Sequence, residues 1–211
     1  MDNLVYILFI CLVAPMLLMV LILRKRSRLL VGYMLVGIFV SLFVSELNTI
    51  LLGFFNDDLL YVTTTITPVS EEIVKAIPVL FYAIVYSDDR DRVIPLAFAT
   101  GVGFAMFENM VILVQNIENV TIGWAVIRGF ATALMHAICT VAVGYGICFV
   151  KKRRKLFYCG TFALLAMASI YHGIFNMLVQ SDYKYLGFFL PAVTYIPLLL
   201  RQFRYYQNSK A

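Results

Sequence analysis

Charged residues are scarce in this sequence, and extended polar stretches are absent. Only 14% of the 211 residues are charged, whereas 62% are hydrophobic; soluble domains average roughly 25% and 45 to 50%. A water-soluble fold has too little interior to bury so many apolar side chains. Because the apolar residues form long runs and do not alternate with polar ones, the pattern favours membrane-spanning helices over a β-barrel.

Cysteine is also scarce. The four cysteines lie in or beside apolar runs, at spacings that match no disulfide framework and no CxxC metal site. The net charge is +5, but the basic residues occur in short clusters beside hydrophobic runs, where they orient helices in a membrane. We therefore expect the lipid bilayer, and not nucleic acid, as the surroundings of the protein.

The apolar runs predict about seven membrane spans of roughly 20 residues or more. No basic residue precedes the first run, and the cluster from Arg24 to Arg28 follows it, so we expect a retained span and not a cleaved signal peptide. Residues 1–211 are expected to form one integral membrane domain without linkers or repeats, with a motif-bearing core at about 59–180. The spans are expected at residues 4–23, 30–55, 59–86, 93–117, 122–150, 156–180 and 185–200.

Lysine and arginine are distributed unequally between the two sets of loops. The seventeen basic residues divide into fourteen on one side, Lys184 alone on the other, and Lys75 and Arg128 within spans. The positive-inside rule then predicts an N-terminus outside and a C-terminus inside. The fourteen are Arg24, Lys25, Arg26, Arg28, Arg90, Arg92, Lys151, Lys152, Arg153, Arg154, Lys155, Arg201, Arg204 and Lys210.

Four of the predicted spans carry polar residues that a bilayer interior penalises by several kcal/mol. Within each span these residues share one helical face. Counted from the outer helix ends at about 1.5 Å per residue, the glutamate pair at Glu72, Glu108 and the two histidines lie roughly 12 to 21 Å deep, which is one layer near the midplane. The residues are Glu71, Glu72 and Lys75 in the third span, Glu108 in the fourth, His136 in the fifth, and His172 and Asn176 in the sixth.

Two chemistries fit such a layer. In one, Glu108, His136 and His172 bind a divalent metal ion, zinc being the most suitable, with one position left open. A glutamate of the neighbouring pair in the third span then takes a proton from the water that the metal activates. In the other there is no metal, a buried glutamate activates water directly, and His172 and Asn176 donate hydrogen bonds to the oxyanion. The spacing leaves both chemistries open.

These residues also form an ordered set of motifs. Residues 71–75 read EExxK, residues 104–108 read FxxxE, the segment from Arg128 to His136 follows, and residues 172–176 read HxxxN. In this order they resemble the PrsW family of bacterial intramembrane proteases, which is related to the Abi/CAAX prenyl protease group. The resemblance covers about half of the chain, and the first and last spans match no motif.

The resemblance implies a protease in the bacterial plasma membrane that makes the first cut in a single-span anti-sigma factor during an envelope-stress response. It implies catalytic roles for Glu71, Glu72, Lys75, Glu108, His136, His172 and Asn176. Members of the family are treated as metalloprotease-like, whereas the CAAX group is also described as glutamate-dependent, so the zinc ion stays open. A proton- or ion-coupled transporter is the alternative, although such a path needs several sites and the sequence shows one layer.

Other polar features favour simpler interpretations. Glu46 and Asn48 in the second span stand outside any motif, so a structural or water-lined role is favoured for both. Cys139 is expected to be an inert packing residue, and Arg128 an electrostatic support. Pro68 precedes the glutamate pair and is expected to open the backbone for water. Because the layer is nearer the outer helix ends, we expect cleavage in the outer half of the membrane or just beyond it.

Overall fold

The computed structural model describes residues 2–208, and the regular secondary structure of these residues is helical throughout. The all-helical prediction is therefore confirmed. Lys210, one of the fourteen basic residues assigned to one side, lies outside the described residues.

The long helices are α1 (Asp2–Ile22), α2 (Lys25–Phe54), α4 (Thr67–Val85), α5 (Arg90–Gln115), α7 (Ala133–Ile147), α8 (Arg154–Gln180) and α9 (Lys184–Asn208). The short elements are α3 (Leu59–Tyr61), α6 (Ile122–Ile127), the π-helical segments η1 (Val62–Ile66) and η3 (Arg128–Thr132), and the 3-10 turn η2 (Ile117–Asn119).

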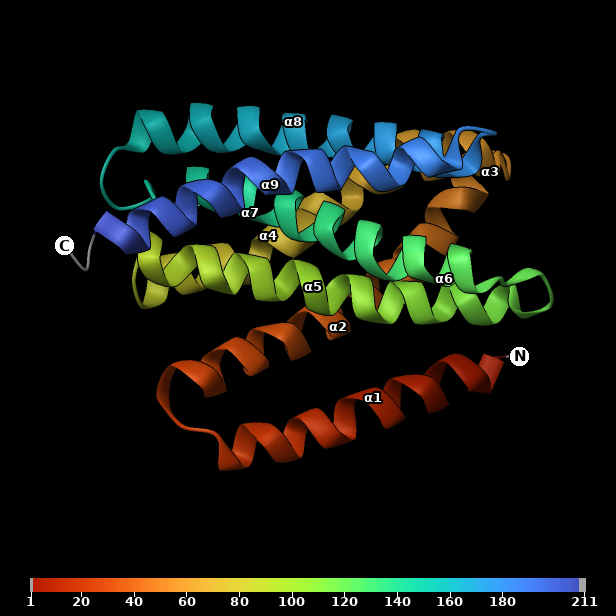
Figure 1. The fold of residues 1–211 in the computed structure, drawn as a ribbon, viewed down its shortest axis with the longest axis horizontal. Helices are drawn as coiled ribbons and strands as arrows, with labels where there is room; N and C mark the ends of the chain where they lie inside the picture. The colour runs from red at the N-terminus through yellow and green to blue at the C-terminus, as the bar shows by residue number, and fades with distance from the viewer. Residues whose placement is uncertain (1, 209–211) are drawn as a thin grey trace.

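Within the described residues the helices form seven passes that run roughly along the long axis of the molecule (Figure 1). α3, η1 and α4 follow one another without a break and make one pass, as do α6, η3 and α7. The two termini lie at opposite ends of the bundle (Figure 1), as an odd number of passes requires. The number of membrane crossings and the outside position of the N-terminus stay predictions.

Five passes are long and apolar enough to cross a membrane. α4 is apolar on most of its surface but carries three charged residues in 19, and several side chains of α9 lie outside the described ones. The chain is thus a polytopic bundle of membrane-spanning helices. The five candidate spans are Leu4–Ile22, Lys25–Phe54, Arg90–Gln115, Ile122–Ile147 and Arg154–Gln180.

Glycine lets α2 and α5 approach closely. A Cβ atom added to Gly103 would collide with the main chain of Met34, and one added to Gly37 would collide with the carbonyl of Thr100. Helices in a bilayer gain little from hydrophobic burial, because lipid tails are as apolar as leucine, so close backbone packing at small residues holds them together. This contact fixes α5, the helix of Glu108, against α2.

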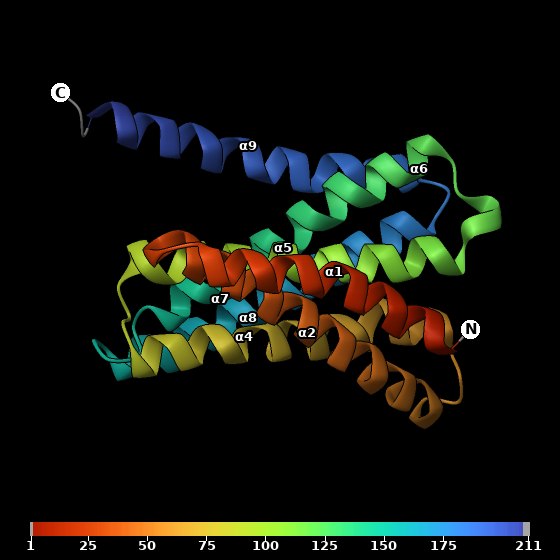
Figure 2. The same ribbon diagram turned by 90° about the horizontal axis from the view of Figure 1, so that it is seen from below.

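α1 packs on the outside of this pair. The ring of Phe9 makes edge contacts with Phe39 and Phe107, with centroids 5.0 and 5.3 Å apart, and Val13 is buried beside them. In the most apolar stretch of α1 only 11% of the residues are buried inside the bundle, against 56% in that of α5. On another face of the molecule, α9 diverges from the other helices toward its C-terminal end (Figure 2). The chemistry of the bundle must therefore lie among α2, α4, α5, α7 and α8.

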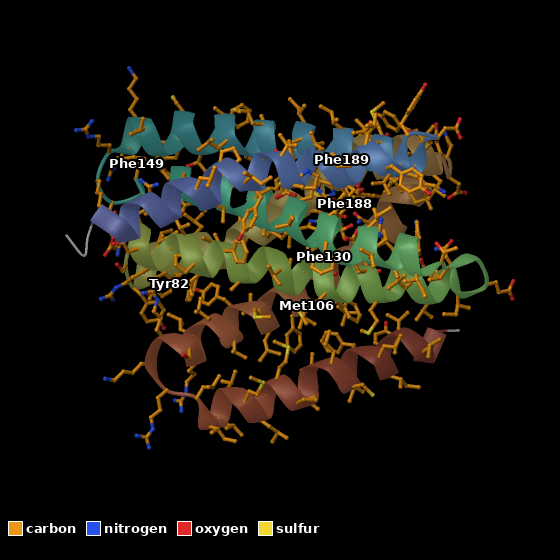
Figure 3. The ribbon with its side chains drawn as sticks, viewed as in Figure 1. Tyr82, Met106, Phe130, Phe149, Phe188 and Phe189 are labelled. Atoms are coloured by element: carbon orange, nitrogen blue, oxygen red, sulfur yellow. The ribbon has the colours of Figure 1, made fainter. Side chains whose placement is uncertain are left out.

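The two ends of the bundle differ in charge. Nitrogen-tipped side chains gather at the end where Phe149 is labelled, and oxygen-tipped side chains are prominent at the other (Figure 3). We call the first the basic end; it holds the connections at 23–24, 86–89 and 148–153. We call the second the acidic end; its connections carry Asp57, Asp58, Glu118 and Asp182.

Candidate active site

α4 supplies a buried ion pair at the centre of the bundle. Glu72 and Lys75 lie three residues apart on one helical face, and the Lys75 Nζ atom is 2.7 Å from Glu72 Oε1. Both side chains are fully buried. A buried charge is costly unless it is paired and hydrogen-bonded, and here each charge neutralises the other. The centre can therefore hold two ionised groups without water.

This ion pair also holds both histidines of the chain. The Lys75 ammonium lies 2.7 Å from His136 Nδ1 on α7, and Glu72 Oε1 lies 2.9 Å from His172 Nδ1 on α8. Since an ammonium can only donate, His136 Nδ1 accepts; since a carboxylate can only accept, His172 Nδ1 donates. The rings meet edge to face, with centroids 4.8 Å apart. Each ring is thus fixed through Nδ1 and presents its Nε2 atom.

The two Nε2 atoms have different surroundings. Nε2 of His136 carries the hydrogen in this arrangement and donates to Glu108 Oε2 at 2.8 Å. Nε2 of His172 keeps its lone pair and has no hydrogen-bond partner, although it is buried. Glu71 Oε2 lies 3.8 Å from it and is also without a partner. Buried polar atoms are almost always satisfied, so this pair of atoms indicates a place where a further ligand fits.

A divalent metal ion is one ligand that fits. Glu71, His136 and His172 each offer one ligand atom, all within 4.8 Å of one another. Two imidazoles and a carboxylate form a known three-ligand zinc set, and the Glu72 carboxylate on His172 Nδ1 is the partner that orients metal-bound histidines. To join the set through Nε2, His136 must lose the Nε2 hydrogen and its hydrogen bond to Glu108, and Nδ1, which then carries the hydrogen, can no longer accept from the Lys75 ammonium. The sequence predicts Glu108 as the carboxylate ligand. Among the described residues, it is Glu71 whose carboxylate lies close to both histidines.

A cavity of about 330 Å³ opens beside these groups. The carboxylates of Glu71 and Glu108 line it, whereas Glu72, Lys75 and the two histidines do not. Most of its other lining residues come from the parts of α2, α5 and α8 that approach the acidic end and from η1, and Leu59, Thr67 and Arg128 complete the lining. Amides and hydroxyls are frequent among them, including Asn48, Thr63, Gln115, Asn176 and Gln180.

Two π-helical segments border the site. η1 precedes the α4 glutamates and η3 precedes His136, and π-helical turns are frequent at functional sites. At η1, Asn176 Nδ2 donates to the Thr63 carbonyl at 2.9 Å, and a Cβ atom on Gly173 would lie 2.6 Å from the Thr64 carbonyl. Gly173 thus lets α8 reach the irregular backbone. Pro68 is the second residue of the regular helix that follows η1, and its opening of the backbone for water stays a prediction.

The structure brings six of the seven residues predicted for the site into one network. Asn176 stands apart, on the cavity wall. Asn48 is not among the residues that the sequence predicts for the site, yet its Nδ2 atom donates to Glu71 Oε1 at 3.3 Å, and Ser70 donates to its Oδ1 at 3.1 Å. Its position in an apolar span was the only signal, since no motif surrounds it. Cys139 bonds weakly to Met135 and to the Ala168 carbonyl, in line with a packing residue.

The fold and the site define a membrane-embedded protein with a carboxylate and histidine centre of the type that hydrolases use. Residues 25–201 match the family described as PrsW family intramembrane metalloprotease. Protease PrsW of Clostridioides difficile (strain 630) is 26% identical over 198 residues, covering 84% of this chain and 81% of the relative. No solved structure matches. The chain belongs to the PrsW family of intramembrane metalloproteases, and α1 lies outside the matched residues.

Proposed function

We propose that this intramembrane protease is an endopeptidase that hydrolyses one peptide bond of a single-span protein in the bacterial plasma membrane. One observation carries the proposal: two glutamates, Glu71 and Glu108, line a partly polar cavity beside a centre in which Glu72 and Lys75 are buried and paired. Such a cavity admits water and an unfolded piece of backbone into the membrane-spanning bundle, which peptide hydrolysis requires.

Glu108 is suited to act as the general base. Its side chain is 23% exposed, which leaves it open to the cavity. In the metal-free arrangement His136 Nε2 holds its Oε2 atom in place; with His136 on the metal, Glu108 is free to contact the attacking water. After taking a proton from the attacking water, Glu108 can return it to the leaving amine, as a single carboxyl group does in acid–base catalysis. Glu72 and Lys75 do not touch the cavity and serve to position the histidines.

The metal is a separate part of the proposal. Glu71, His136 and His172 would hold zinc, which would supply Lewis acidity toward water and the scissile carbonyl. Their grouping within 4.8 Å supports this set. The set expected from the sequence, with Glu108 as ligand and a glutamate of the α4 pair as base, is the alternative within the same site. A metal-free centre in which a glutamate activates water is the second alternative.

The position of the cavity favours a cut near the acidic end, which the positive-inside rule predicts to lie outside. Glu108 is about 10 Å from the end of α5 at Gln115 and about 27 Å from its start at Arg90. A substrate helix must unwind before attack, and unwinding costs least near the interface, where water satisfies the freed groups. We propose an anti-sigma factor as the substrate, as the motif resemblance implies, cut at its extracytoplasmic juxtamembrane segment.

Purified protein in nanodiscs tests the function directly. Incubated with a single-span anti-sigma factor, the wild-type protein should release two fragments, and mass spectrometry should place their new termini at the extracytoplasmic edge of the span. A cut at the cytoplasmic edge would contradict either the orientation or the depth argument. Ion movement in liposomes without any cleavage would instead support the transporter alternative.

A further inference from the structure

Arg128 is a buried cation with unused hydrogen-bond donors. It lies in η3, its residue is 8% exposed, and its Nε and Nη2 atoms have no hydrogen-bond partner. Its side chain lines the same cavity as Glu71 and Glu108. Leaving guanidinium donors unpaired away from water is costly. The arrangement therefore indicates that these donors meet an acceptor that enters the cavity.

The known contacts of Arg128 do not use these donors. Nη2 lies 4.0 Å from Glu108 Oε1, which is beyond hydrogen-bond range. The Trp124 ring centroid is 6.0 Å from Cζ, a distant cation–π contact. Asn109 Nδ2 donates to the main-chain carbonyl of Arg128 at 2.9 Å, which fixes the backbone and leaves the guanidinium free. The Glu108 carboxylate therefore lies near the Arg128 guanidinium, but the Nε and Nη2 hydrogens of Arg128 remain available for a hydrogen-bond acceptor.

We propose that Arg128 donates to the carbonyl oxygen of the scissile peptide bond and stabilises the negative charge that develops there. This inference rests on the proposed protease function. If Glu108 takes the proton from water, the attacked carbon must lie beside Glu108, and the carbonyl oxygen then falls within reach of a guanidinium 4.0 Å from that carboxylate.

The step balances without any further reactant. The water oxygen bonds to the carbonyl carbon, its proton passes to Glu108, and the carbonyl π electrons move to the oxygen that Arg128 contacts. When the carbonyl re-forms, the C–N bond breaks and Glu108 returns the proton to the amine. Arg128 thus binds weakly to a neutral carbonyl and strongly to the anion, which is the difference that accelerates a reaction.

A substrate carboxylate is a less suitable partner for Arg128. The cavity already holds the carboxylates of Glu71 and Glu108, and a third anion would be repelled by both. The donors first expected for the oxyanion are also engaged elsewhere. Asn176 donates to the Thr63 carbonyl, and His172 Nδ1 to Glu72. Arg128 is the cavity-lining cation whose donors remain.

Steady-state kinetics on Arg128→Gln and Arg128→Lys test the role. We expect kcat to fall about 10²- to 10³-fold in Arg128→Gln, as for the loss of an oxyanion donor, with KM changing less than about threefold. Arg128→Lys should recover only part, because one ammonium cannot reproduce a fixed fork of N–H groups. Arg90→Gln is the matched control, since Arg90 bonds Tyr145 at the basic end, and it should keep wild-type kinetics.

Chemical rescue separates this role from a structural one. Millimolar guanidinium should raise the kcat of Arg128→Ala at least tenfold and saturably, and should leave wild type and Arg90→Gln unchanged. A folded Arg128→Gln with wild-type kcat, a defect confined to KM, or full activity in Arg128→Lys together with no rescue would each overturn the proposal. If Arg128→Gln and Arg128→Ala do not fold, the kcat of Arg128→Lys decides by the same criteria. Wild-type protein that cuts no single-span substrate would instead overturn the proposed function, and this inference with it.

Discussion

The polar centre has two halves with opposite designs. The closed half consists of Glu72, Lys75 and the Nδ1 atoms of the two histidines; every charge there has a partner within 2.9 Å and none reaches the cavity. The open half consists of Glu71, Glu108 and Arg128, which line the cavity and keep unpaired or weakly paired atoms. Buried charges persist in the first half because they are paired, whereas those in the second lie beside a cavity that a substrate can enter.

Because of this difference, one membrane helix is both stable and reactive. Glu71 and Glu72 are neighbours in the sequence, but the 100° turn between them directs one toward Lys75 and the other toward the cavity. Glu72 is paired through Oε1, which accepts from both Lys75 and His172, although its Oε2 atom has no hydrogen-bond partner; this pairing makes Glu72 a support for the histidines. Incomplete pairing leaves Glu71 Oε2 and His172 Nε2 available to a ligand. Mutations in the open half should therefore lower cleavage, and mutations in the closed half should lower stability.

The largest effect is expected in the open half. Glu108→Gln removes the proposed base and should lower cleavage about 10²- to 10⁴-fold, with little change in thermal unfolding. Glu46→Gln is the matched control, because Glu46 is also a glutamate within a membrane-spanning helix but accepts from Tyr6 on α1, away from the site. Quantifying fragments on gels over time compares the variants. Near-wild-type cleavage by Glu108→Gln would remove Glu108 from catalysis.

The closed half should respond through stability. Lys75→Met leaves Glu72 as a buried charge without its ammonium partner, which typically costs about 3 to 5 kcal/mol of unfolding free energy. The double variant Glu72→Gln/Lys75→Met removes both charges and should recover much of that loss. Denaturant titration in mixed micelles measures both. If the single variant is as stable as wild type, the pair does not support the centre as the geometry implies.

The sequence predicted the closed half better than the open half. Helical class and a common depth follow from apolar runs and a fixed rise per residue, and these sufficed to place the glutamates, Lys75 and both histidines together. Which carboxylate faces the histidines depends on side-chain rotamers, which spacing does not encode. Asn48 reaches Glu71 because of how α2 is rotated against α4, and η1 and η3 differ from α-helix only in hydrogen bonding. None of these leaves a periodic signal in the sequence.

Metal binding should distinguish the two open-half carboxylates. If Glu71 is the ligand, Glu71→Gln should weaken zinc affinity by at least about 100-fold, the upper end of what the loss of an orienting partner costs, whereas Glu108→Gln should bind nearly as wild type. Calorimetric titration of metal-stripped protein measures both affinities. The reverse result would favour the set containing Glu108. Substoichiometric metal in fully active protein, with activity unchanged by a strong chelator, would favour glutamate catalysis without metal.

The smallest effect is expected at Asn48, which ties the open half to α2. Asn48→Ala removes the donor to Glu71 Oε1, a contact of 3.3 Å, and the acceptor for Ser70. A hydrogen bond of this kind contributes about 1 kcal/mol, so we expect kcat to fall about fivefold as Glu71 becomes less ordered. Asn116→Ala is the control, because Asn116 is exposed and bonds only within its own helix end, to the Ile112 carbonyl. A loss above 100-fold in Asn48→Ala would place Asn48 in direct contact with the reacting groups, and no loss would show that Glu71 is held without it.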